Sequence, residues 1–147
     1  MQKIPLAPFI FFGLLAAPLS LAAEEDSRVA VEMPAMMRAH MLANMRDHLL
    51  SMQQIQSRLA AGEYDAAADI AEQRLGMSSL QSHGASHMAG FMPQGMRETG
   101  TAMHHAASRF AVISQEASVT RDLPRALGAL SEITSQCVAC HAAYRLK

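Results

Sequence analysis

Apolar side chains recur at intervals of three and four residues over most of the chain, which is the spacing of a helix with one buried face. The first such segment spans residues 34–61, and its stripe consists of Met41, Met45, His48, Met52, Ile55 and Leu59. Pro34 suits the first turn of this helix, and Gly62 suits the position just after its end. The pattern therefore predicts a long first helix over residues 34–61.

Three more helices follow from the same pattern, and no strand is predicted. The second spans residues 66–75, with Asp65 as its cap, Gly76 as its stop and a light inner face of alanines. The third runs from Pro93 to about residue 117, and Gly100 on its inner stripe would suit a bulky neighbour or would arise by chance. Thr120 or Asp122 caps the fourth, whose predicted inner stripe is Leu123, Leu127, Leu130, Thr134, Cys137, His141 and Tyr144.

Short connections between four helices favour an all-α fold, an up-down-up-down antiparallel four-helix bundle. Residues 77–92 are expected to be irregular, with at most a short helical turn, because Gly84 and Gly90 interrupt them. In such a bundle the end of the fourth helix lies near the start of the first and near the link between the second and third.

The last eleven residues carry the most specific chemical signal, Cys137-Val-Ala-Cys140-His141. Cys-x-x-Cys-His is the pattern of covalent c-type haem attachment, in which two thiols bind the haem and the histidine ligates the iron. On a helix these three side chains share one face. The pattern therefore predicts thioethers from Cys137 and Cys140 and a proximal ligand from His141.

Two other interpretations of the motif are weaker. A disulfide or thioredoxin-like redox pair normally opens a helix after a strand, and no strand is predicted here. Structural zinc usually takes four Cys or His ligands in two separated pairs, whereas this chain has two cysteines in total. Haem is the preferred ligand.

The N-terminus has the pattern of a secretory signal peptide: Lys3 near the start, an apolar stretch to Leu21, and small residues at Ala22 and Ala23. An uncleaved anchor is disfavoured because Pro5 and other helix breakers interrupt the stretch. We expect a signal peptide at residues 1–22, a flexible leader at 23–33 and a haem domain at 34–147. No second apolar run of that length follows, so no membrane span is predicted after signal cleavage. The signal peptide predicts export, and for a protein with a c-type haem motif the expected compartment is the periplasm.

Charge excludes one class of partner. The formal net charge is −1 and becomes about −2 without Lys3, and this balance gives no case for nucleic-acid binding, which would call for a basic face. No nucleotide-binding loop or Ser/His/Asp nucleophile pattern appears. The sequence therefore gives no case for an enzyme.

The layout resembles the cytochrome c′ family and its low-spin relatives. The resemblance rests on the attachment motif close to the C-terminus followed by Tyr144-Arg145, and it covers the mature chain in helix layout. It implies one covalent haem c, with Arg145 near a haem propionate. It also implies that an inward residue of the first helix forms the distal side, where Met45 or Met41 is the candidate ligand.

The many methionines and histidines depart from the typical family pattern. A methionine on a helical stripe is usually core filler, and His48 on the same stripe is more often a hydrogen-bonded core residue than a ligand. His83 and His87 are four apart among several methionines, a set that would suit copper if the segment were helical. A loop packed against the haem is the favoured alternative, and His104 and His105 are expected on the surface.

The predicted function is a periplasmic monohaem electron carrier that exchanges electrons with redox partner proteins. A five-coordinate haem protein that binds nitric oxide or carbon monoxide is the alternative, and a copper-handling protein is less favoured. The sequence leaves open whether two copies associate as a homodimer.

Overall fold

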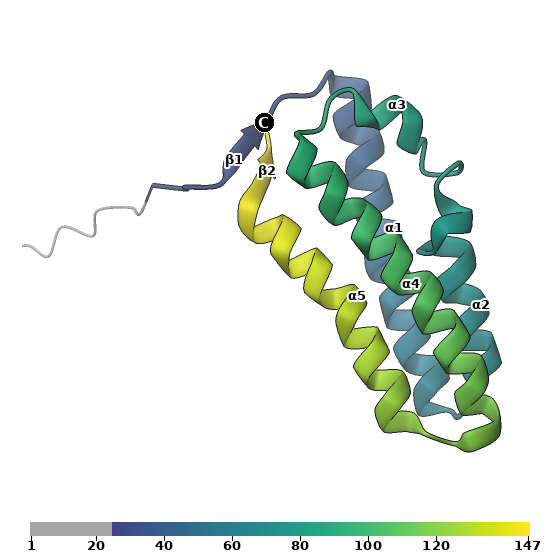
Figure 1. Cartoon of the computed structure of the whole chain (residues 1–147). Helices are drawn as coiled ribbons and strands as arrows, with labels where there is room; N and C mark the ends of the chain where they lie inside the picture. The colour runs from purple at the N-terminus through teal and green to yellow at the C-terminus, as the bar shows by residue number, and fades with distance from the viewer. Residues whose placement is uncertain (1–24) are drawn as a thin grey trace, which may run out of the picture.

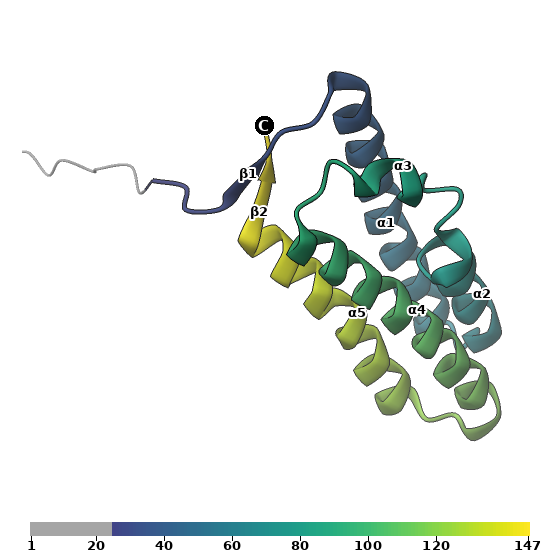
Figure 2. The same cartoon turned by 45° about the horizontal axis from the view of Figure 1, so that its top comes forward.

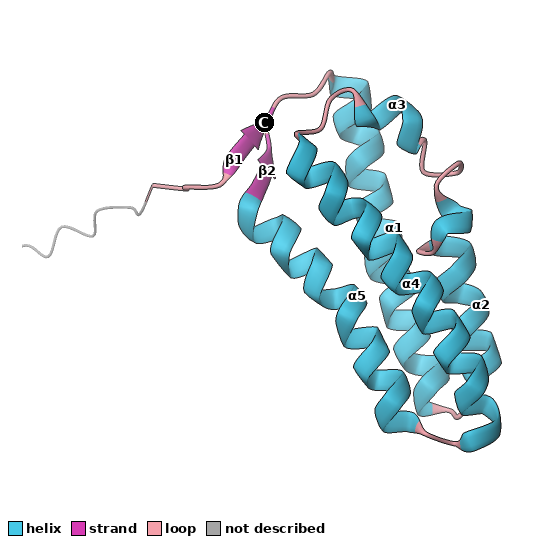
Figure 3. Ribbon diagram, in the orientation of Figure 1, coloured by secondary structure: helices cyan, strands magenta, loops and turns pink. Residues whose placement is uncertain are grey.

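The computed structural model describes residues 25–147, so the predicted signal peptide lies outside the described residues. Most of the described chain is helical, and the all-α prediction is confirmed (Figure 3). Four long helices dominate the structure: α1 (Ala35–Ala60), α2 (Tyr64–Arg74), α4 (Gln94–Thr120) and α5 (Leu123–Ala143). Between α2 and α4 lie a short 3₁₀ turn, η1 (Met77–Ser79), and the short helix α3 (Ala85–Ala89).

Successive long helices run in opposite directions, as Figures 1 and 2 show. Helix α4 packs against both α2 and α5, and α1 packs against α2. The start of α1, the start of α4 and the end of α5 therefore lie at one end of the molecule, where α3 also lies (Figure 2). This end contains the Cys-x-x-Cys-His motif.

The helix ends follow local sequence signals. Pro34 and Pro93 directly precede α1 and α4, and Gly62 after α1 has a φ of 74° in the left-handed region, where glycine is favoured. At α5 the cap is Asp122, whose carboxylate accepts a hydrogen bond from the Arg125 backbone N–H at 3.0 Å.

The predicted cap of α2 is wrong by two residues. This helix begins at Tyr64 because the backbone oxygen of Glu63 already accepts the Ala67 N–H at 3.1 Å. Asp65 lies in the first turn, where a carboxylate still favours the positive end of the helix dipole.

The main core lies among α1, α2, α4 and α5. Its largest fully buried side chains are Phe110, Ile55, Leu75 and Ile133. The inner face of α2 is made largely of alanines, which lets neighbouring helices approach closely. The small inner side chains of this helix agree with the prediction from the sequence.

The predicted inner stripe of the last helix is only partly correct. Leu130 is buried, but Leu127 is 46% exposed and Thr134 is also exposed. The buried face includes Ala126 and Ile133 instead. Helix α5 packs mainly against α4, so its buried face points toward that helix and is rotated from the predicted stripe.

Two short strands were missed. Strand β1 (Val29–Val31) pairs in parallel with β2 (Tyr144–Leu146), and Lys147 donates its backbone N–H to the Val31 oxygen at 3.0 Å. Val31 is 3% exposed and Met33 is also buried. Residues 29–31 of the predicted leader therefore pair with the chain's last residues, and Val31 and Met33 are buried beside them.

In the part of the chain that the structure describes, no helix combines the length and apolar character needed to cross a membrane.

Candidate functional site

A cavity of about 690 Å³ opens at the end of the molecule that contains the Cys-x-x-Cys-His motif. Its size falls within the usual range for small-molecule and cofactor sites. Side chains from α1, α3, α4, α5 and β2 form its wall. Six methionines give this wall an apolar, sulfur-rich character: Met41, Met45, Met88, Met92, Met96 and Met103.

The motif meets this cavity through Cys140 and His141, which both line it. Cys137 is half-buried one turn earlier on α5, where its thiol lies 3.5 Å from the Ile133 backbone oxygen. Both cysteines are free, and burial raises the pKa of each thiol. Both sulfurs are therefore neutral thiols at pH 7, which is the less reactive form, and Cys140 is the cysteine that lines the cavity.

Met41 and Met45 approach the same cavity from α1. Met41 is buried, and Met45 is partly buried in the hydrophobic cluster to which Cys140 also belongs. The structure therefore brings Met41 and Met45 to the same cavity as Cys140 and His141. The other members of this hydrophobic cluster come mainly from β1, α3, α4 and β2. The wall of the cavity therefore depends on the packing of these elements against one another.

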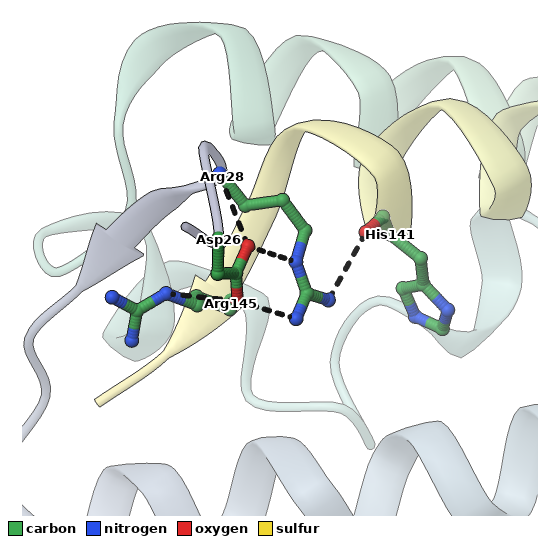
Figure 4. Close-up of polar contacts among 4 residues, drawn as sticks. All are labelled: Asp26, Arg28, His141 and Arg145. Atoms are coloured by element: carbon green, nitrogen blue, oxygen red, sulfur yellow. Dashed lines mark hydrogen bonds and ion pairs between the residues drawn. The ribbon is translucent and has the colours of Figure 1, made fainter. Parts of the chain in front are cut away.

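A charged group closes the edge of the cavity next to β2 (Figure 4). Arg28 forms an ion pair with Asp26 at 2.8 Å, and the Arg145 Nε lies 3.2 Å from the same carboxylate. Hydrogen bonds from Arg28 lower the pKa of Asp26 to about 2, with a smaller contribution from Arg145. Arg28 also donates to the backbone oxygen of His141 at 3.4 Å, whereas the His141 ring extends away from this group.

Two guanidinium groups thus share one carboxylate, and the group has a net charge of +1. Both Arg28 and Arg145 also line the cavity. An anionic group at this edge would meet a positive potential and planar donors suited to carboxylates. Arg145 was predicted for this position from the sequence, whereas Arg28 and Asp26 were missed because they precede the first predicted helix.

Three histidines gather on another part of the cavity wall: His48, His83 and His104. His104 is only 8% exposed, so its predicted surface position is wrong, whereas His105 is exposed as predicted. The proposed pairing of His83 with His87 is not observed, because His87 is exposed on α3 while His83 faces the other two rings.

Burial is the largest cause that lowers the pKa of all three imidazoles, and it lowers the pKa of His48 to about 4. All three rings are therefore neutral at pH 7. His48 is buried as predicted for a core residue, but its Nε2 has no hydrogen-bond partner. A buried ring nitrogen without a partner is uncommon and calls for an explanation.

Within residues 25–147, no three His, Cys, Asp or Glu side chains stand ready-made in the geometry of a metal site. Comparison of the chain with models of known protein families, with curated proteins and with solved structures found no match.

Proposed function

We propose that the chain is a monohaem c-type cytochrome that transfers electrons in the periplasm. Cys137 and Cys140 would form the two thioether bonds, and His141 would ligate the iron. The observation that carries the proposal is the position of Cys140 and His141 on the wall of a cavity of about 690 Å³. A bound haem supplies one-electron chemistry between ferric and ferrous iron.

The cavity wall fits a large apolar ring with two carboxylates. Its methionines would surround a bound ring with apolar groups, an environment that favours the less charged ferrous state and raises the reduction potential. Arg28 and Arg145, with their surplus positive charge, would hold the propionates at the edge next to β2. In this arrangement the haem would lie at one end of an up-down-up-down four-helix bundle.

A methionine of α1 is the proposed sixth ligand, with Met45 or Met41 in that role. The supporting observation is that both residues line the cavity and share its wall with Cys140. Thioether ligation stabilises ferrous iron and closes the position that nitric oxide or carbon monoxide would occupy. A gas-binding, five-coordinate site is the competing function.

The haem is tested by expressing the full chain in cells that mature cytochromes c and isolating the exported protein. We expect a coloured product whose mass includes one covalently bound haem. The matched variants Cys137→Ser and Cys140→Ser remove one attachment point each, and the double variant should lose covalent haem. A colourless wild-type protein with two free thiols would refute the proposal.

Spectra of the ferric and ferrous protein then test the sixth ligand. We expect a low-spin, six-coordinate iron that binds carbon monoxide poorly in the wild type. Either Met45→Leu or Met41→Leu should convert it to a five-coordinate form that binds carbon monoxide readily. Ready binding by the wild type, unchanged in both variants, would favour the gas-binding function instead.

A further inference from the structure

Three imidazoles from three separate elements form a compact group, called here the three-histidine cluster. His48 comes from α1, His83 from the turn between η1 and α3, and His104 from α4. Their ring centroids are 4.8 Å apart for His48 and His83, 5.6 Å for His83 and His104, and 6.1 Å for His48 and His104.

These separations match the scale of a metal site with three histidine ligands. A metal–nitrogen bond is about 2.0 Å, and the ring centre lies about 1 Å beyond the nitrogen, so tetrahedral ligands place ring centroids about 5 Å apart. Two of the three separations are slightly wider than this. The nitrogens do not stand ready-made around one point, so binding requires the rings to reorient.

Hydrogen bonds already orient two of the rings. His104 Nδ1 lies 2.7 Å from the Leu75 backbone oxygen, which can only accept, so Nδ1 carries the hydrogen. Ser79 Oγ donates its hydrogen to the Gly76 oxygen at 2.7 Å and can therefore accept from His83 Nδ1 at 3.3 Å. In both rings the lone pair is then on Nε2.

This is the tautomer that metal-ligating histidines adopt when the other ring nitrogen donates to a carbonyl or hydroxyl group. The third ring, His48, offers its Nε2, which is buried and has no hydrogen-bond partner and is therefore free to act as a ligand. The lowered pKa of each ring keeps all three in the neutral form that binds metals.

We propose that His48, His83 and His104 bind a divalent transition-metal ion through their Nε2 atoms, with Zn²⁺ and Cu²⁺ as the ions that imidazole ligands suit best. The cluster forms one part of the cavity wall, beside the part formed by Cys140 and His141. This site uses none of the residues proposed to attach the haem, and it goes beyond electron transfer by a single haem.

The experiment titrates the purified, haem-loaded protein with Zn²⁺ and, separately, with Cu²⁺ by calorimetry. We expect one equivalent to bind with high affinity. His83→Ala and His104→Gln should each weaken binding at least tenfold, as should His48→Gln. Two exposed neighbours give matched controls, and His87→Ala and His105→Ala should retain wild-type affinity.

Electron paramagnetic resonance of the Cu²⁺-loaded protein supplies a readout that a purely structural role would not change. Coupling to imidazole nitrogens is expected in the wild type and should diminish in His83→Ala, whose fold is checked by circular dichroism. Binding that is unchanged in His83→Ala and His104→Gln would overturn the proposal, as would equal loss in the two control variants.

The same titration on the Cys137→Ser/Cys140→Ser protein separates this site from the haem. Zinc or copper binding that still depends on His83 supports the cluster even if no haem is attached. Conversely, a coloured protein that binds neither ion at the cluster refutes this inference and leaves the cytochrome proposal intact.

Discussion

Gly100 offers a test of where the proposed haem would lie. This glycine lies in the second turn of α4 and lines the cavity, and a Cβ atom added there would meet nothing within 4 Å. Alanine is favoured over glycine in a helix interior by about 1 kcal/mol. In a protein without haem, Gly100→Ala should therefore stabilise the fold by about 1 kcal/mol.

A haem packed against this position would reverse the effect. The added methyl group would press on the ring, and overpacking of this kind typically costs about 1–3 kcal/mol. The gain in helix propensity would then be cancelled or exceeded, so Gly100→Ala should leave the haem-loaded protein unchanged or destabilise it by up to about 2 kcal/mol. The absorption spectrum of the haem should shift as well.

Gly128→Ala is the matched control, because Gly128 is also inside a long helix, has no atom within 4 Å of an added Cβ and does not line this cavity. It should stabilise both forms by about 1 kcal/mol, a rise in Tm of about 4 °C. Urea denaturation of each variant, with and without the two attachment cysteines, measures both effects. If Gly100→Ala stabilised the haem-loaded protein as much as Gly128→Ala does, the haem would not lie against Gly100.

Three further substitutions test the fold that positions the site, each measured by denaturation unless stated. Ile133→Ala removes a fully buried side chain and should cost about 3 kcal/mol, whereas the exposed Val138→Ala on the same helix should change stability by less than about 0.5 kcal/mol. Ser114→Ala removes the 2.8 Å hydrogen bond that the Ser114 hydroxyl donates to the Tyr64 backbone oxygen of α2, and it should lower the free energy of unfolding by about 1–3 kcal/mol. Val31→Ala should lower the free energy of unfolding by about 2 kcal/mol and speed amide hydrogen exchange in β2. The control Val29→Ala changes an exposed side chain of the same strand and should not speed this exchange.

The long helices were predictable because their signals are local. In α1 the apolar spacing placed Met41, Ile55 and Leu59 on the buried face, and the structure buries all three. Pro34 and Gly62 fixed its ends through backbone preferences that act within one turn. The chemistry of the Cys-x-x-Cys-His motif is also a local signal.

The short strands and the facing of α5 were not predictable in this way. Strands β1 and β2 have three residues each, too few to show a period, and they pair two segments at opposite ends of the chain. Which side of α5 is buried depends on its main partner being α4, which only tertiary packing determines.

The sequence singled out His83 as a candidate ligand but paired it with His87, whereas in the structure it lies beside His48 and His104. His83 and His87 are four apart, but Gly84 between them has a φ of 64°, so the backbone is not helical there and the four-residue rule does not apply. His83 instead meets His48, which lies on the same predicted stripe of α1 as Met45. One face of α1 therefore contributes to both the proposed haem pocket and the three-histidine cluster. If binding of an ion at the cluster shifts this face and changes the affinity of the pocket for haem, then haem binding must change the affinity of the cluster for the ion by the same factor.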